Sequence, residues 1–318
     1  MNVNRMPDTF FTSPPDWTIY IVPYFFVGGI AGGLYLLAAL LHWRGRAADE
    51  PVVRLGYLAS ALGAVLSGVL LTFDLGRPLR FWHMLLQSER FPLPIFKPWS
   101  PISIGAWALL AFGIFATLST IGAWAASGPT RFSRLRIFYD GLPGRILAAV
   151  GAFFGLFIAG YTGVLLSVTN RPIWADSNFI GLLFLLSGIS TAAATLILLI
   201  RWRAQCESTR STVQWLTWFD GWLLLLELAV LFAFIVSLGR IAAVWLNAWG
   251  LALVLLVMVA GILVPLALHF RPSMFRESWR PHSVVAGAVL VLIGGFFLRV
   301  VVLAASDAIS RTQAGLFR

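Results

Sequence analysis

Long apolar runs recur along the whole chain, and short polar connections separate them. Eight runs stand out, at 17–42, 52–74, 99–125, 143–169, 176–201, 213–238, 246–270 and 281–305. Each run is long enough to cross the hydrocarbon core of a bilayer, which is about 30 Å thick. An open strand edge cannot satisfy its backbone hydrogen bonds in lipid. The pattern therefore predicts an all-α integral membrane protein with eight transmembrane helices.

The composition agrees with the membrane class. The chain is 59% hydrophobic and 11% charged, whereas about 25% of the residues in a soluble domain are charged. Its net charge of +10 comes from arginines spread over the connections, which favours membrane lipid over nucleic acid as a partner. The one cysteine, Cys206, excludes a disulfide framework and a cysteine-held iron–sulfur cluster. The N-terminus lacks the features of a signal peptide, so we expect the first run to be retained.

The positions of the arginines predict an orientation. They are concentrated in the connections that follow the first, third, fifth and seventh runs. Because positive residues favour the cytoplasmic side, we expect both termini and the 75–98 loop to lie outside the cytoplasm.

The densest group of polar residues begins where the second run ends. Asp74, Arg77 and His83 lie close together in the sequence, and Gly76 and Pro78 break the helix between them. A carboxylate beside a guanidinium and an imidazole can bind a polar headgroup and exchange protons with it, as a quinone ring requires. A salt bridge and a helix cap in a surface loop are the alternative explanation.

Ionisable residues inside the apolar runs form a second group of candidates. Asp220 and Glu227 are seven positions apart in the sixth run and therefore share a helix face. Arg299 lies in the outer half of the eighth run, where its long side chain can reach the depth of Glu227. These residues indicate either a proton path or a buried charge pair that locks two helices together. Tyr161, in the fourth run, is either a ring contact and proton donor or a packed tyrosine.

Two other classes of membrane protein stay open. The short matching segments 74–77 and 237–240 suggest parallel repeats, which would suit a solute or ion transporter. Against a transporter, no run is interrupted near its middle by paired glycine and proline, apart from Pro265 near the inner end of the seventh run. A haem held between His42 and His269 is less favoured, because both histidines lie at helix ends. The sequence indicates no metal site.

Four segments carry a resemblance to a known family. They are the glycine-rich stretch 28–33 of the first run with 24–26 before it, and the segments 74–84, 100–107 and 161–174. In order and spacing they resemble the NrfD-like family, which supplies the membrane subunit of polysulfide reductase and related complexes. The resemblance covers roughly residues 17–175, and the second half fits in helix number and polarity.

The resemblance implies a fold and a function. Such proteins have two four-helix bundles, here 1–175 and 176–318, and the first bundle binds a quinone, menaquinone or ubiquinone, near the outer surface. They carry no haem or iron–sulfur cluster of their own. Electrons pass between the quinone and a ferredoxin-like iron–sulfur subunit, which contacts a molybdopterin oxidoreductase subunit. The implied location is the bacterial cytoplasmic (inner) membrane, with both termini and the 75–98 loop on the periplasmic side.

The motif matches also imply roles for single residues. Asp74 and His83 are expected to exchange protons with the ring as the catalytic pair. Arg77 would orient Asp74, Tyr161 would contact a quinone oxygen, and Tyr24 is a further quinone-binding candidate. Proton translocation along Asp220, Glu227 and Arg299 would accompany this reaction.

Overall fold

Eight helices that are long and apolar enough to cross a membrane lie in the part of the chain that the structure describes. The computed structural model describes residues 17, 19–87, 93–128, 130–169, 171, 173–203, 209–239, 242, 245–270 and 280–316, without the side chains of 130–132, 280–281 and 307–316. The spans are α1 (Ile21–Arg44), α2 (Glu50–Asp74), α3 (Pro101–Ser127), α4 (Gly141–Ser167), α5 (Ile180–Arg203), α6 (Arg210–Ser237), a composite seventh span and α9 (Arg280–Leu316). The prediction of an all-α fold with eight spans is confirmed.

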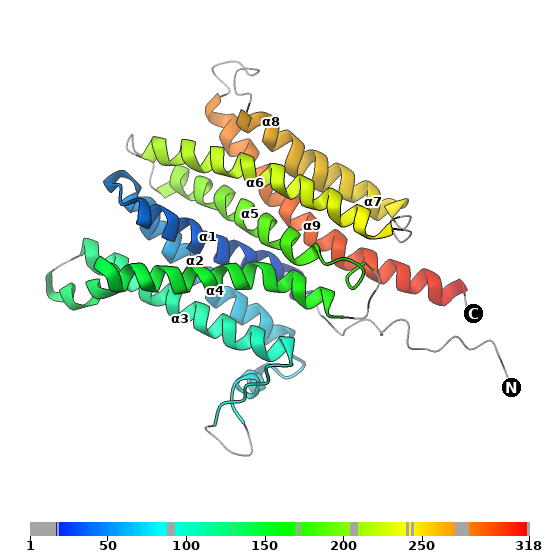
Figure 1. Cartoon of the computed structure of the whole chain (residues 1–318), viewed down its shortest axis with the longest axis horizontal. Coiled ribbons are helices and arrows are strands. Elements are labelled where there is room, and N and C mark those ends of the chain that lie inside the picture. The colour runs from blue at the N-terminus through cyan, green and yellow to red at the C-terminus, as the bar shows by residue number, and fades with distance from the viewer. Residues whose placement is uncertain are drawn as a thin grey trace.

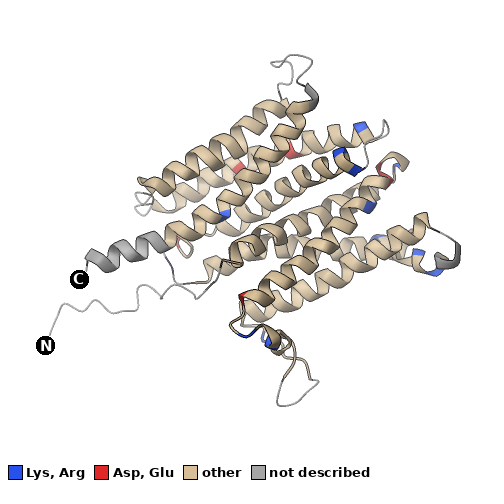
Figure 2. Ribbon diagram, turned by 180° about the vertical axis from the view of Figure 1, so that it is seen from behind, with Lys and Arg blue, Asp and Glu red and all other residues tan. Residues whose placement is uncertain are grey.

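The spans pack side by side with their axes roughly aligned (Figure 1). Because their number is even, α1 begins and α9 ends at the same end of the bundle. Lys and Arg gather mainly at the opposite end, around the connections that follow the odd-numbered spans (Figure 2). This opposite end also holds the short helices η1 (Ala47–Asp49) and η3 (Thr130–Phe138).

The first span lies at the centre of the packing. It contacts α2 and α4 as well as α5, so it joins the two halves of the chain. Glycines allow these close approaches. A Cβ on Gly32 would overlap the backbone of Gly155 in α4, and a Cβ on Gly29 would lie 3.4 Å from the Cα of Gly188 in α5. The division into two four-helix bundles at residue 175 stays a prediction.

The seventh span is irregular. It consists of α7 (Ala248–Ala252), the π-helical stretch η6 (Leu253–Leu263) and α8 (Val264–Phe270). Pro265 has no N–H to donate to the carbonyl four residues earlier, which disfavours α-helical pairing just before it. Gly261 in this stretch also packs against the backbone of Gly294 in α9, where a Cβ would lie 2.5 Å from the Gly294 Cα. The sequence pattern includes Pro265 but does not by itself predict a π-helix.

The connection between α2 and α3 folds back beside both helices. It contains the 3₁₀ helix η2 (Pro78–Met84) and a single antiparallel bridge between Leu86 and Pro94. The indole nitrogen of Trp107 in α3 donates a 2.6 Å hydrogen bond to the carbonyl of Ile95, which holds this connection against α3. Arg90 and Pro92 of the predicted 75–98 loop lie outside the described residues.

Candidate functional site

A cavity of about 1090 Å³ lies where η2 folds back beside α2 and α3. Its lining comes from α1, α2, η2, α3 and α4, so residues far apart in the sequence meet there. Pockets for small organic ligands have volumes of about 300–1000 Å³, so this one is large. Along α3 its lining runs from Ile102 to Leu118, which corresponds to about 24 Å of helix.

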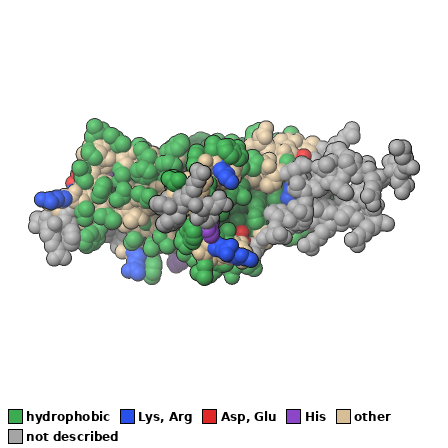
Figure 3. Space-filling view, turned by 90° about the horizontal axis from the view of Figure 1, so that it is seen from below, with side chains coloured by type: hydrophobic (Ala, Val, Ile, Leu, Met, Phe, Trp, Pro, Cys, Tyr) green, Lys and Arg blue, Asp and Glu red, His purple; other side chains and the backbone are tan. Residues whose placement is uncertain are grey.

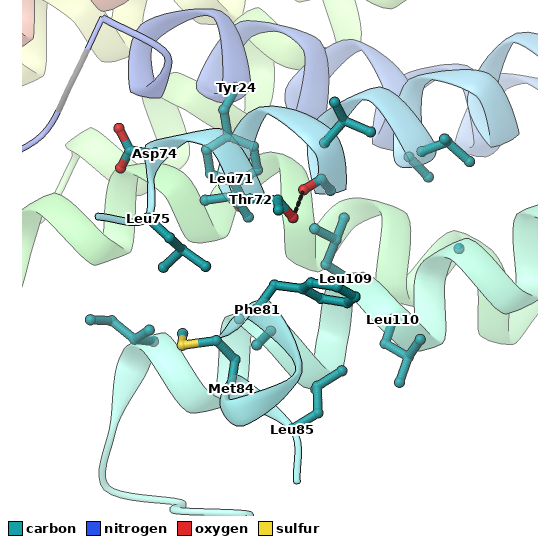
Figure 4. Close-up of a pocket in the computed structure, with 18 of the residues that line it drawn as sticks. Tyr24, Leu71, Thr72, Asp74, Leu75, Phe81, Met84, Leu85, Leu109 and Leu110 are labelled. Atoms are coloured by element: carbon teal, nitrogen blue, oxygen red, sulfur yellow. Dashed lines mark hydrogen bonds between the residues drawn. The ribbon is translucent and has the colours of Figure 1, made fainter. Parts of the chain in front are cut away.

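The wall is apolar over most of its surface, and its carboxyl group and its two phenol groups lie at one end. Tyr24, Asp74 and Tyr161 line the end formed by the beginning of α1 and the ends of α2 and α4. The Thr72 hydroxyl also lines the cavity but donates a 2.8 Å hydrogen bond to the Gly68 carbonyl of its own helix. The Thr117 hydroxyl, farther along α3, donates a 2.7 Å hydrogen bond to the Gly113 carbonyl of its own helix. Figure 4 shows Asp74 at the end of α2 and Tyr24 entering from α1.

Tyr161 is held in place by α3. Its hydroxyl donates a 2.6 Å hydrogen bond to the carbonyl of Pro101 in the first turn of α3. Its ring stacks on Phe157, with the ring centroids 5.5 Å apart. The side chain is buried, yet it reaches the cavity wall. Its hydroxyl oxygen can still accept a hydrogen bond from a ligand.

The cavity opens sideways between α2 and α3. Val69 and Phe73 of α2 and Leu110 and Ile114 of α3 line it, and all four are also exposed on the outer surface of the bundle. In the space-filling view, apolar side chains cover most of the described surface on the side of the molecule where η2 lies (Figure 3). A ligand in this cavity would therefore remain in contact with lipid.

Two glycines widen this opening. Gly68 of α2 and Gly113 of α3 both line the cavity, and a Cβ built on either would have no other heavy atom within 4 Å. Phe81 and Met84 of η2 face the α2 side of the cavity from across it (Figure 4). The sequence pattern does not indicate a role for Gly68, Gly113, Phe81 or Met84, because periodicity does not show which helix faces adjoin an open space.

Arg77 and His83, the other two candidates from this segment, do not line the cavity among the described residues. Arg77 is exposed and precedes η2. The His83 ring packs against Trp82, with centroids 3.8 Å apart and planes inclined by 33°. The structure thus brings Asp74, Tyr24 and Tyr161 to one cavity and places Arg77 and His83 beside it.

Arg299 lies at a junction of three helices. Its guanidinium donates to the carbonyls of Phe25, Phe184 and Gly295 and to the Ser187 hydroxyl, at distances of 2.6–3.4 Å. Ser187 also interacts with Glu227, whose carboxyl is electrostatically coupled to Arg299. Both charged residues are buried. Glu227 and Arg299 therefore belong to one cluster.

Asp220 lies in a separate buried contact nearer the other end of α6. It accepts a 2.6 Å hydrogen bond from Ser190, and its second oxygen is 3.6 Å from the Nδ1 atom of His269 in α8. Ser187 and Ser190 are three residues apart on α5, so the two acidic residues of α6 face one side of that helix. The sequence did not indicate that His269 pairs with Asp220.

Comparison with known proteins identifies the family. The family described as "Polysulphide reductase, NrfD" has a sequence model that matches residues 8–310. The chain belongs to the NrfD family. It is 28% identical to a polysulfide reductase polypeptide of Wolinella succinogenes over 311 residues, which cover 92% of this chain and 94% of that protein.

Two further relatives of this NrfD-family chain are similar at lower identity. Protein NrfD of Escherichia coli is 25% identical over 328 residues, covering 92% of this chain and 94% of the relative. A selenate reductase subunit of Mesobacillus selenatarsenatis is 24% identical over 218 residues, covering 59% of this chain and 48% of the relative. The predicted resemblance is thereby confirmed and extends over both halves of the chain.

Proposed function

We propose that this chain is the quinone-reactive membrane subunit of an oxidoreductase complex. Quinones are lipophilic, with a polar ring and an apolar tail, and the cavity offers the matching surfaces. Its carboxyl and phenol groups lie at one end, and the remainder is mainly apolar and open to lipid between α2 and α3. This combination is the observation that carries the proposal.

The residues at the polar end have distinct proposed roles. The Asp74 carboxyl accepts or releases a proton beside the ring, and the Tyr161 hydroxyl binds a ring oxygen. Tyr24 closes the side of the ring near α1. Because His83 does not line the cavity, we assign it no contact with the ring; its packing on Trp82 helps to hold η2 beside the cavity. Arg77 sets the charge around Asp74 from outside the cavity.

Electron transfer requires partner subunits in this proposal. The relatives named above include components of polysulfide and selenate reductases. Among the described residues, no group of three or more His, Cys, Asp or Glu side chains could hold a metal ion. We propose a ferredoxin-like iron–sulfur subunit that docks on the 75–98 loop, with a molybdopterin catalytic subunit beyond it. In the bacterial inner membrane, this loop and both termini would face the periplasm.

Proton movement through the second half is a further part of the proposal. Asp220 and Glu227 are buried on one side of α6, and Arg299 balances the charge near Glu227. We propose that these residues carry protons coupled to quinone turnover.

A transporter built from parallel repeats is the second candidate. The irregular backbone of η6 favours it, because ion and solute pathways are often formed where spans depart from α-helical geometry. Arg240 of the suggested repeat lies outside the described residues. Co-purification distinguishes the candidates, since only the first requires iron–sulfur and molybdenum proteins bound to this chain.

Replacement of Asp74 tests the proposed function directly. Asp74→Asn keeps the shape and removes the titrating carboxyl, so we expect quinone turnover to fall by about 100-fold or more with assembly intact. Asp176→Asn is the matched control, because Asp176 is an exposed acid in the α4–α5 connection that does not line the cavity. Normal turnover in Asp74→Asn would remove Asp74 from the mechanism.

A further inference from the structure

Polar side chains form a line along the contact between α1 and α2, away from the charged cluster of the second half. On α1 they are Tyr24, Tyr35 and His42, whose spacing places them on one helix face. On α2 they are Tyr57, Ser60 and Ser67, with Asp74 at the cavity end. The two helices run antiparallel, so the line extends from the cavity to the opposite end of the bundle. We call it the α1–α2 seam.

The seam reaches water at the end opposite the cavity. There Tyr139 donates a 2.7 Å hydrogen bond to Glu50, whose side chain is 32% exposed and whose carboxylate lies 3.4 Å from the Arg54 Nε atom. The Tyr139 ring packs on His42, with centroids 4.1 Å apart, and the Tyr57 hydroxyl lies 3.4 Å from the His42 Nδ1 atom. Asp140 and Arg145 are further charged groups near His42. Burial, and then the Glu50 carboxylate, raise the pKa of Tyr139 above its ordinary value. Tyr139 therefore remains protonated and able to donate.

The middle of the seam is also lined by hydroxyl groups. Tyr35 lies against Tyr57, with centroids 5.0 Å apart, and its hydroxyl is 2.6 Å from that of Ser119 in α3. Ser60 donates a 2.9 Å hydrogen bond to the Ala31 carbonyl of α1. Both of its lone pairs remain available to accept a hydrogen bond.

The cavity end contains a buried hydroxyl with spare hydrogen-bonding capacity. Ser67 is buried, and its hydroxyl has no hydrogen-bond partner among the described residues. This hydroxyl would lie 3.6 Å from a Cβ on Gly28, and the Tyr24 ring would lie 3.7 Å from the same Cβ. Gly28 thus leaves a notch between Ser67 and Tyr24, and Tyr24 lines the cavity. A buried polar notch of this kind suits an ordered water molecule.

We propose that the α1–α2 seam conducts protons between the cavity and the membrane surface opposite it. The proposal rests on the proposed quinone function. When a quinone in the cavity is reduced, it gains two electrons from the iron–sulfur partner and two protons, which form its two new O–H bonds. These protons enter at Glu50 and pass through His42 and the tyrosine hydroxyls, and each seam group returns to its starting state. Quinol oxidation reverses every step.

The step from Ser60 to Ser67 spans about 11 Å of α2, which exceeds one hydrogen bond. Ordered water between the serine hydroxyls bridges this distance in the proposal. Interhelical packing alone would not require the polar groups to continue to a solvent-exposed carboxylate. Electrons arrive at the cavity side and protons at the opposite side, so turnover through the seam would itself move charge across the membrane.

Two variants test the seam at independent points. Tyr57→Phe removes one hydroxyl and keeps the ring that packs on Tyr35. Gly28→Ala fills the notch beside Ser67, and its Cβ would make only ordinary contacts of 3.6 Å or more. Tyr20→Phe is the matched control for the first variant, because Tyr20 is 40% exposed and lies outside both the seam and the cavity lining.

The measurement uses the complete complex in lipid vesicles, with a pH indicator trapped inside and an electron donor that cannot cross the membrane. This donor drives only complexes whose cavity side faces outward. For the unaltered complex, we expect quinone reduction to consume protons from the vesicle interior. Both seam variants should lower turnover by about 100-fold with an unchanged KM for quinone. Lowering the interior pH should restore part of the rate, and changing the exterior pH should not.

Two results would contradict the proposal that the α1–α2 seam conducts protons. One is turnover in both variants equal to that of the control. The other is slowed turnover that responds to exterior pH alone. A separate variant, Gly68→Phe, obstructs the cavity and leaves the seam unchanged. Normal quinone turnover in Gly68→Phe would show that the quinone does not bind in this cavity, and the proposed function would fail. Slow turnover in Gly68→Phe with normal turnover in both seam variants would contradict the seam alone.

Discussion

Tyr161 of α4 lies directly against Gly105 of α3, where a side chain on Gly105 would overlap the tyrosine ring. The hydroxyl of Tyr161 reaches past this glycine to the Pro101 carbonyl, 2.6 Å away. Gly105 itself lines the cavity. The position of the Tyr161 hydroxyl beside the proposed quinone therefore depends on residue 105 being a glycine, which has no side chain.

We expect Gly105→Ala to weaken quinone binding while the protein stays folded in the membrane. The new methyl group must displace Tyr161, and loss of one well-placed hydrogen bond raises KM by roughly tenfold. Steady-state kinetics with a soluble quinone analogue measure this change. Gly76→Ala is the control, because a Cβ there meets nothing within 4 Å. Equal KM values for the two variants would show that Tyr161 does not contribute to quinone binding.

The opening between α2 and α3 predicts a dependence on the length of the quinone tail. Gly113→Phe should slow turnover of a long-tailed quinone much more than that of a short-tailed analogue. The phenyl ring would occupy the apolar part of the cavity, about 12 Å along α3 from the Gly105 end. Rates with the two substrates provide the measurement, and Gly113→Ala is the control for loss of the glycine. Equal slowing of both substrates would place the tail elsewhere.

The Glu227–Arg299 pair predicts a strong coupling in stability. Arg299→Met leaves the buried Glu227 carboxyl without its cation, which should destabilise the protein by about 3–5 kcal/mol. The double variant Arg299→Met with Glu227→Gln should regain part of this loss, because the orphaned charge is then absent. Unfolding of the purified protein in detergent measures the stability of Arg299→Met, of Glu227→Gln alone and of the double variant. Additive losses would show that the two groups do not stabilise each other.

A buried contact between the two halves of the chain predicts a smaller effect. Thr212 of α6 donates a 2.5 Å hydrogen bond to Asp49 in the connection between α1 and α2. Thr212→Val should cost about 1–3 kcal/mol, since a buried carboxylate oxygen loses its donor. Thr217→Val is the control, because the Thr217 hydroxyl donates a hydrogen bond to the Val213 carbonyl of its own helix. Equal unfolding temperatures for both variants would contradict this role.

The sequence predicted the spans well, because lipid leaves helices as the way for each apolar run to satisfy its backbone. It also predicted which ends of the spans carry the candidate site. The start of α1 and the ends of α2 and α4 must lie on one side of the membrane, so Tyr24, Asp74 and Tyr161 could be placed together from topology. Whether their side chains face one cavity depends on how each helix is rotated about its own axis, and only the structure shows that rotation.

Other features depend on packing that periodicity does not encode. The His83 ring packs on Trp82 within η2, a contact that the spacing of the residues does not predict. Arg299 lies in one cluster with Glu227, and most of its hydrogen bonds go to backbone carbonyls of α1, α5 and α9, which the sequence does not predict. A side chain's partner across a helix interface is set by the rotation and register of both helices. A single sequence leaves those quantities open.

Photolabelling tests the central claim most directly. A quinone that carries a photoreactive group is bound to the complex, illuminated, and its attachment sites are identified by mass spectrometry of the peptides. We predict labels on residues of α2, η2 and α3 that line the cavity, such as Phe73, Phe81 and Leu109, and loss of these labels with excess unmodified quinone. Specific labels confined to α5–α9, with the cavity residues unmodified, would contradict the assignment.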